Sequence, residues 1–179
     1  GQQAVLDDIE LFEVKHLAIL AVDVAERMKA HGLDKAIAVP DLNEVITILD
    51  PDGLKMATFY VYDSYCQELR DLRAQMRQNP SRQEELLAEC AEIEEGVRRD
   101  LSKQLVPFAK ALEEAQIAMA KIDMNLAKAL QIKQLGLCFP TISKDDISRY
   151  EAMFHPQVKD ALAQRKRAFQ PVSLTLGQK

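Results

Sequence analysis

The chain has 179 residues, and 47% of them are hydrophobic, which is enough to bury a core as one domain or as one and a half. Glycine (6) and proline (7) are scarce, so a largely disordered chain is excluded. The net charge of −5 and the pI near 5.3 argue against a broad nucleic-acid-binding face, although they do not exclude a local basic patch.

The first helix is expected over residues 6–30, because its apolar residues recur at helical spacing on a wide stripe. Gly32 is a typical stop signal for it. A short second helix is expected after Pro40, with Asp41 and Glu44 in the spacing of a capping box.

Residues 58–62 combine the strongest strand propensity in the chain with the start of a helical stripe. Because that stripe continues at spacings of three and four, the sequence favours a helix from this segment to about Gln78. The stripe consists of Phe59, Tyr62, Cys66, Leu69, Leu72 and Met76.

A long helical region follows the Asn79-Pro80 break. Ser81 and Glu84 have capping-box spacing, and an apolar stripe then runs from Leu86 to Ala129. Pro107 is expected to kink or break this helix. The two matched stripes predict an antiparallel hairpin over about 54–107 with its turn at residues 79–81. The alanine-rich stretch 109–135 is expected to be more deeply packed.

The helical pattern changes near residue 141. Gly136 and Pro140 close the long helix, and Ser143 to Asp146 form either another capping signal or the loop into a new domain. The alternation of Val172, Leu174 and Leu176 predicts a strand. The expected fold is therefore mainly α: a multi-helix bundle with a long protruding helical hairpin in domain 1–140, and a short α/β segment at 141–179.

Cys66, Cys90 and Cys138 are odd in number, lie far apart and form no C-x-x-C pair. This spacing argues against a zinc site and predicts buried or half-buried free thiols in a reducing compartment. No metal site of any kind is predicted.

No signal peptide is recognised at the N-terminus. The most apolar run, Leu17 to Val22, ends at Asp23 and is far shorter than the roughly 20 residues that a membrane span needs. The expectation is a cytoplasmic protein without a membrane partner.

Several stretches, taken in order, resemble the MutS family of DNA mismatch-repair ATPases. The first half carries Leu11-Phe12-Glu13-Val14-Lys15-His16, Leu49-Asp50-Pro51-Asp52-Gly53 and Thr58-Phe59-Tyr60-Val61-Tyr62-Asp63-Ser64-Tyr65. The second half carries Ala118 to Leu130, Cys138-Phe139-Pro140, His155-Pro156-Gln157-Val158 and Gln170-Pro171-Val172-Ser173-Leu174. The resemblance covers nearly the whole chain, and the order of the motifs carries it more than any one of them.

The resemblance implies that residues 1–140 are the core, lever and clamp helices, and that residues 141–179 are the truncated start of an ATPase domain. It implies ATP and magnesium as cofactors of the full-length protein, double-stranded DNA as its partner, and a homodimer. The chain itself contains no G-x-x-x-x-G-K-[ST] loop and no recognisable Walker B carboxylate, so it is expected to bind no nucleotide and to have no catalytic residue.

The resemblance also suggests site residues. Phe169 and His155 would contact the adenine side of the nucleotide in the full-length protein, whereas core packing and a local turn are their ordinary alternatives. Arg73, Arg77 and Arg82 lie near the expected hairpin tip, where the family's clamp touches the DNA backbone. Acidic neighbours make an ordinary charged surface the alternative interpretation of these arginines.

Two other function classes fit parts of the sequence. The spacing of Arg149 and His155 loosely matches helical ribonucleases of the HEPN type. A helical scaffold without catalysis would also explain the long apolar stripe and the charge.

Overall fold

The computed structural model describes residues 4–177 and is mainly helical, with a small antiparallel sheet near the C-terminus. This coarse fold class was predicted and is confirmed. The chain divides into two compact units, Gly1–Met124 (unit 1) and Asn125–Lys179 (unit 2). The domain boundary expected after residue 140 stays a prediction. Within residues 4–177, no helix combines the length and the apolar character needed to cross a membrane.

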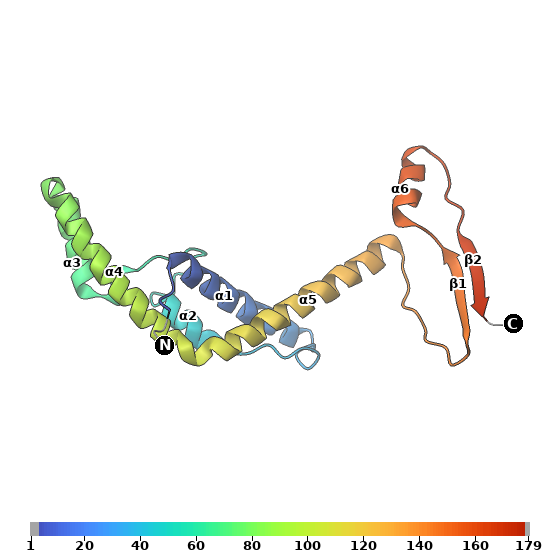
Figure 1. The fold of residues 1–179 in the computed structure, drawn as a ribbon, viewed down its shortest axis with the longest axis horizontal. Coiled ribbons are helices and arrows are strands. Elements are labelled where there is room, and N and C mark those ends of the chain that lie inside the picture. The colour runs from blue at the N-terminus through green and yellow to red at the C-terminus, as the bar shows by residue number, and fades with distance from the viewer. Residues whose placement is uncertain (1–3, 178–179) are drawn as a thin grey trace. The chain divides into compact units, whose positions relative to one another are not determined.

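Helix α1 (Asp8–Ala30) is the central helix of unit 1 (Figure 1). Asp7 caps its start by accepting hydrogen bonds from the backbone N–H groups of Ile9 and Glu10, and the Glu10 side chain returns a bond to the Asp7 N–H. Gly32, with φ of 68°, follows its end in the left-handed region that favours glycine.

Helix α2 (Asn43–Leu49) lies where the second helix was expected, but its predicted capping box is absent. Leu42 is the N-cap, and no side chain caps the helix. Asp41 instead accepts hydrogen bonds from the backbone N–H and the side-chain amide of Asn43. The Asp41 side chain thus stabilises a local turn. Such local hydrogen bonds of Asp compete with helix capping.

The prediction that a helix begins near residue 58 is wrong. Residues 58–62 form neither helix nor strand, a 3₁₀ turn (η1) covers Asp63–Tyr65, and α3 runs only from Gln67 to Gln78. Phe59, Val61 and Tyr62 are buried in this extended segment. Their aromatic and β-branched side chains pack into the core without a helix, so the apparent stripe does not report helical geometry.

A 3₁₀ turn (η2, Pro80–Arg82) joins α3 to α4 (Gln83–Leu105). The prediction of a capping box at Ser81 and Glu84 is wrong, because Arg82 occupies the N-cap position and no side chain caps α4. Helices α3 and α4 lie side by side (Figure 1) and share an apolar cluster that includes Leu69, Leu72, Leu86 and Cys90.

The predicted break at Pro107 is confirmed: α4 ends at Leu105, a 3₁₀ turn (η3) covers Val106–Phe108, and α5 runs from Ala109 to Leu135. The expectation that residues 109–135 are deeply packed is wrong for most of the helix. Only Ala115 and Ala118 are buried in α5, and residues 123–131 are all exposed. Alanine richness reflects helix propensity here rather than burial.

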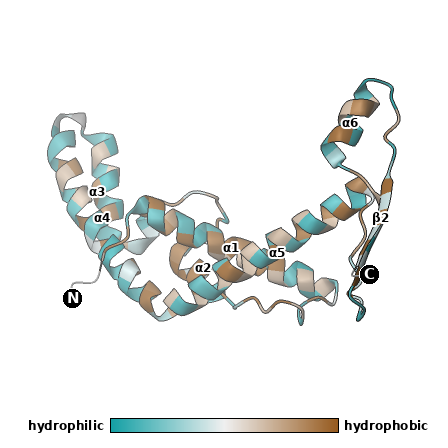
Figure 2. Ribbon diagram, turned by 45° about the vertical axis from the view of Figure 1, so that its right-hand side comes forward, coloured by the Kyte–Doolittle hydropathy of each residue, from teal (hydrophilic) through white to brown (hydrophobic). Residues whose placement is uncertain are grey.

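Unit 1 has its main core around α1, α2 and the second half of α4. Figure 2 shows hydrophobic residues concentrated where α1 and α2 meet. The fully covered side chains at this place include Leu11, Ala18, Leu42, Val45 and Leu49. Burial of such side chains supplies the main stabilisation of the helical unit.

In unit 2, strands β1 (Ile147–Met153) and β2 (Val172–Gly177) pair antiparallel, with α6 (Pro156–Gln164) between them in the chain. The predicted strand at 172–176 is confirmed, while β1 was not predicted. Residues 143–146 lead into β1 and cap no helix. The register is irregular between Tyr150 and Met153, and Ala152 has φ of 51° there.

Candidate functional site

Two of the three arginines expected to contact DNA are exposed at the α3–α4 turn. Arg77 lies in the last turn of α3 and has no ion pair among residues 4–177. Arg82 lies at the start of α4 and pairs with Glu85 over 3.0 Å, with more than half of each side chain exposed (58% and 60%). An exposed pair of this kind is weak, so a phosphate group competes readily for the Arg82 guanidinium.

Arg73 has a different environment. It is the least exposed of the three (22%), and it bonds to Asp63 on one side and to Glu94 of α4 over 2.8 Å on the other. Partial burial lowers the pKa of Arg73, but the hydrogen bonds to the two carboxylates outweigh it and raise the pKa above its ordinary value. A phosphate would therefore have to displace a carboxylate to reach this side chain.

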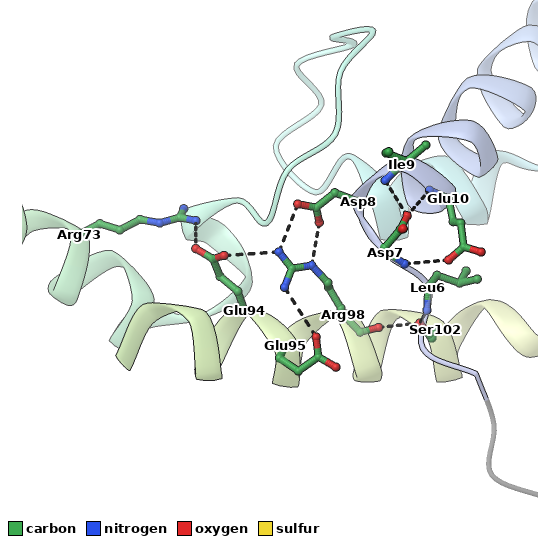
Figure 3. A network of polar contacts seen from close by, with 10 residues as sticks. All are labelled: Leu6, Asp7, Asp8, Ile9, Glu10, Arg73, Glu94, Glu95, Arg98 and Ser102. Atoms are coloured by element: carbon green, nitrogen blue, oxygen red, sulfur yellow. Dashed lines mark hydrogen bonds and ion pairs between the residues drawn. The ribbon is translucent and has the colours of Figure 1, made fainter. Parts of the chain in front are cut away.

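Glu94 connects Arg73 to a second arginine that the sequence analysis did not single out (Figure 3). One carboxylate oxygen of Glu94 accepts from Arg73, and the other lies 3.4 Å from Arg98 one turn further along α4. Arg98 also makes a two-point contact with Asp8 of α1, at 2.8 and 3.2 Å. The hydrogen bond to Asp8, helped by the charges of the neighbouring carboxylates, outweighs partial burial and raises the pKa of Arg98.

This group of side chains, which we call the Glu94 network, joins three parts of unit 1. It comprises Asp8, Asp63, Arg73, Glu94, Glu95 and Arg98. The sequence signals for it are the spacings of Glu94 and of Glu95 to Arg98, four and three residues on one helix. The pairs of Arg73 with Asp63 and Glu94, and of Arg98 with Asp8, join different elements, so helical spacing does not reveal them.

A second polar cluster lies inside the core of unit 1. Lys15 of α1 is only 1% exposed, and its ammonium group donates to the Thr58 carbonyl and to the Tyr62 hydroxyl. Nearby, the Tyr65 hydroxyl donates to the Ile48 carbonyl over 2.7 Å. Burial, followed by the charges around it, raises the pKa of Tyr65 strongly. Each bond ties the 58–65 segment to a helix, so these contacts serve structure.

The two residues assigned to the nucleotide lie in unit 2. His155 is the exposed N-cap residue of α6, and its carbonyl accepts a hydrogen bond from the Lys159 N–H. Phe169 is half-buried in the segment between α6 and β2. No ring contact or hydrogen bond joins the two side chains in the part of the chain that is described.

The described residues contain no group of three or more His, Cys, Asp or Glu side chains that could hold a metal ion. All three cysteines are free thiols. Cys90 is buried and Cys66 half-buried as expected, whereas Cys138 is exposed, contrary to the expectation.

Compared with models of protein families, with curated proteins and with solved structures, the chain matches none of them. The case for a function therefore depends on the sequence motifs and on the geometry described above.

Proposed function

We propose that this chain is the helical lever and clamp region of a MutS-like DNA-binding ATPase, together with the start of its ATPase domain. In this proposal α3 and α4 form a clamp-like antiparallel hairpin that protrudes from a helical bundle, and residues 141–179 begin the ATPase domain. The full-length protein binds double-stranded DNA as a homodimer and uses ATP with magnesium. Its role is mismatch repair or control of recombination.

One observation carries the lever role. Helices α4 and α5 follow each other through η3 without a loop, and their 23 and 27 residues correspond to about 35 and 40 Å of helix. This helical run begins at the turn that presents Arg77 and Arg82 and ends before the strands of unit 2. Stiff helices of this length are suited to transmit a rigid-body rotation between a DNA-binding end and a nucleotide-binding end.

The sheet of unit 2 supports the second half of the proposal. Two-stranded sheets are marginally stable by themselves in water. Here β2 leaves apolar side chains open, with Val172 54% and Leu176 57% exposed. Exposed apolar side chains of this kind are suited to pack against further structure, as the start of an ATPase domain would require. His155 and Phe169 flank the helix between the two strands, where the family resemblance assigns them to the nucleotide.

No observation favours the alternatives over this proposal. Arg149 lies on strand β1 rather than on a helix, so the structure lends no support to a helical ribonuclease. A scaffold without catalysis would use the same long helices. The scaffold alternative differs from the proposal because it predicts no ATP hydrolysis and no DNA binding that responds to ATP.

The test is ATP hydrolysis by the full-length gene product, which the proposal predicts to be longer than 179 residues, compared with hydrolysis by the chain of 179 residues. The proposal predicts a G-x-x-x-x-G-K-[ST] loop shortly after β2, magnesium-dependent hydrolysis by the longer product, and none by the shorter chain. A longer product without that loop and without hydrolysis contradicts the proposal and favours the scaffold. Hydrolysis by the shorter chain would place the site in residues to which we assign no catalytic role.

A further inference from the structure

The apolar core of unit 1 is divided into two clusters that meet on α4. The first cluster contains Leu101 and Leu105 from the C-terminal half of the helix, and the second contains Leu86 and Cys90 from its N-terminal half. Between Cys90 and Leu101, α4 has no buried side chain. Two partly buried side chains lie there: Ile93 packs against the second cluster and Val97 against both. The middle of α4 is therefore held by fewer and less buried apolar contacts than the two halves of the helix.

Ion pairs lie along the same stretch of α4. Glu94 accepts from Arg73 of α3 and Arg98 contacts Asp8 of α1, so the Glu94 network joins both neighbouring helices to the same two turns of α4 (Figure 3). The side chains of Arg73, Glu94 and Arg98 are about one-fifth to one-quarter exposed (22%, 25% and 19%). Water and salt reach bonds of this kind, so they break and form more easily than buried apolar contacts.

Gly96 lies at the centre of the same stretch. Glycine in a helix interior weakens the helix, because it gains conformational freedom when the helix opens. A close contact would be one reason to have glycine here, but a Cβ atom at Gly96 would meet no other atom within 4 Å. Packing therefore does not require glycine at this position, and its effect is to lower the resistance of α4 to bending.

From these three observations we propose that residues 91–100 of α4 form a hinge, and that the Glu94 network is the latch that fixes its angle. When the ion pairs are intact, α3 and the first half of α4 are held at one orientation against α1. When the pairs are screened or removed, the α3–α4 pair swings about Gly96, while Val97 and Tyr65 keep the apolar contacts that they make with both clusters. The inference concerns unit 1 alone and goes beyond the proposed function, because it requires neither DNA nor ATP. It also sets a condition on the lever role: α4 transmits a rotation only while the latch is closed and the hinge is fixed.

The test measures the distance between two spin labels on the full 179-residue chain. The labels are attached through unnatural amino acids at Glu13 of α1 and Ala88 of α4, both exposed, so the native cysteines stay unchanged. Electron paramagnetic resonance gives the distribution of label distances at about 0.1 M and about 1 M salt, where the screening length falls from about 10 Å to about 3 Å. We expect a narrow distribution at low salt and a broad or shifted one at high salt.

Variants separate the latch from the hinge. Glu94→Gln removes the shared carboxylate and should broaden the distribution already at low salt. Glu92→Gln, at an exposed position of the same helix, is the matched control and should leave the distribution as in the unchanged chain. Gly96→Ala stiffens α4 and should narrow the distribution at high salt.

The outcomes decide the proposal. A distribution that does not respond to salt in the unchanged chain overturns the latch, whether or not any variant folds. A Glu94→Gln chain of normal helix content that stays as narrow as the Glu92→Gln control overturns the role of Glu94. A Gly96→Ala chain as broad at high salt as the unchanged chain overturns the hinge at Gly96.

Discussion

The ammonium nitrogen of Lys15 lies 2.9 Å from the hydroxyl oxygen of Tyr62, a residue 47 positions further along the chain. The same ammonium group donates to the Thr58 carbonyl, which also accepts from the Tyr62 hydroxyl. The nitrogen lies 5.3 Å from the centre of the Tyr62 ring as well. This contact fixes the 58–62 segment against α1 in a conformation that is neither helix nor strand.

We predict that Lys15→Ala destabilises unit 1 by about 2–4 kcal/mol, because it removes both hydrogen bonds and leaves a cavity in the core. Lys15→Met should cost less, since it refills the volume and removes a buried charge. The measurement is urea unfolding followed by tyrosine fluorescence, which reports mainly on unit 1 through Tyr60, Tyr62 and Tyr65. The exposed Lys29→Ala is the control, with an expected change within about 0.5 kcal/mol. A Lys15→Ala chain as stable as this control would show that Lys15 is not buried as described.

Elements whose signals are local were predictable from the sequence. The break at Pro107 and the turn at Gly32 follow from backbone chemistry at single residues, and the alternation at 172–176 follows from the strand period. Residues 58–66 were mispredicted because their conformation depends on Lys15, far away in the chain. Strand β1 was missed because Ser148, Arg149 and Glu151 break the regular alternation that marks a strand, and because its partner β2 lies beyond an intervening helix.

Tyr65 makes the stability of unit 1 sensitive to alkaline pH. Burial raises its pKa above the usual value of about 10, so the folded state holds the proton more tightly than the unfolded state. The stabilisation that protonated Tyr65 contributes to the folded state is therefore complete below about pH 10, and it is lost as the pH rises further. Tyr65→Phe should cost about 1 kcal/mol at neutral pH, because the Ile48 carbonyl loses its bond.

The difference between the unchanged chain and Tyr65→Phe should shrink above about pH 10. Urea unfolding at a series of alkaline pH values measures it. Tyr60→Phe, at a tyrosine that is 47% exposed, is the control and should change the free energy of unfolding at neutral pH by less than about 0.5 kcal/mol. If the Tyr65→Phe difference stays constant, Tyr65 does not titrate differently in the folded state.

The candidate site was predictable only in part. Exposure of Arg77 and Arg82 follows from their place beside a Pro-containing turn between two polar helix ends. Arg73 has the same residue type and lies one turn before Arg77, yet its partner Glu94 is 21 residues away. A pairing across two helices depends on how they pack, which the spacing along one helix does not reveal.

Ala152 lies in a backbone conformation that L-residues other than glycine rarely adopt, with φ of 51°, and its N–H donates to the Ser173 hydroxyl. We predict that Ala152→Gly stabilises the β1–β2 sheet by about 0.5–1 kcal/mol through relief of this strain. Ala161→Gly, inside α6, is the matched control and should destabilise its helix by about 1 kcal/mol. The rates of amide hydrogen exchange in the strands and in α6 measure these two effects. If the strands of Ala152→Gly exchange faster than those of the unchanged chain, the prediction is wrong.

The chain of 179 residues should bind duplex DNA weakly. Its net charge is −5, and non-specific affinity for DNA comes from phosphate contacts made by lysine and arginine. Under the proposed function, the ATPase domain is needed to close the ring that holds DNA, and the chain contains only its start. A titration of labelled duplex at low and moderate salt checks this expectation; tight binding that salt does not weaken would contradict it.

The most direct test of the proposed function is duplex binding by the longer gene product that the proposal predicts, with ATP and magnesium present. The account predicts that Arg77→Ala with Arg82→Ala weakens binding and lowers the salt dependence, by a slope of about 2 for two lost phosphate contacts. Arg27→Ala with Arg99→Ala removes the same charge from exposed positions elsewhere in unit 1 and should leave the slope unchanged. If both double variants bind as the unchanged protein does, or if the longer product does not bind duplex DNA, the α3–α4 turn is not a DNA clamp.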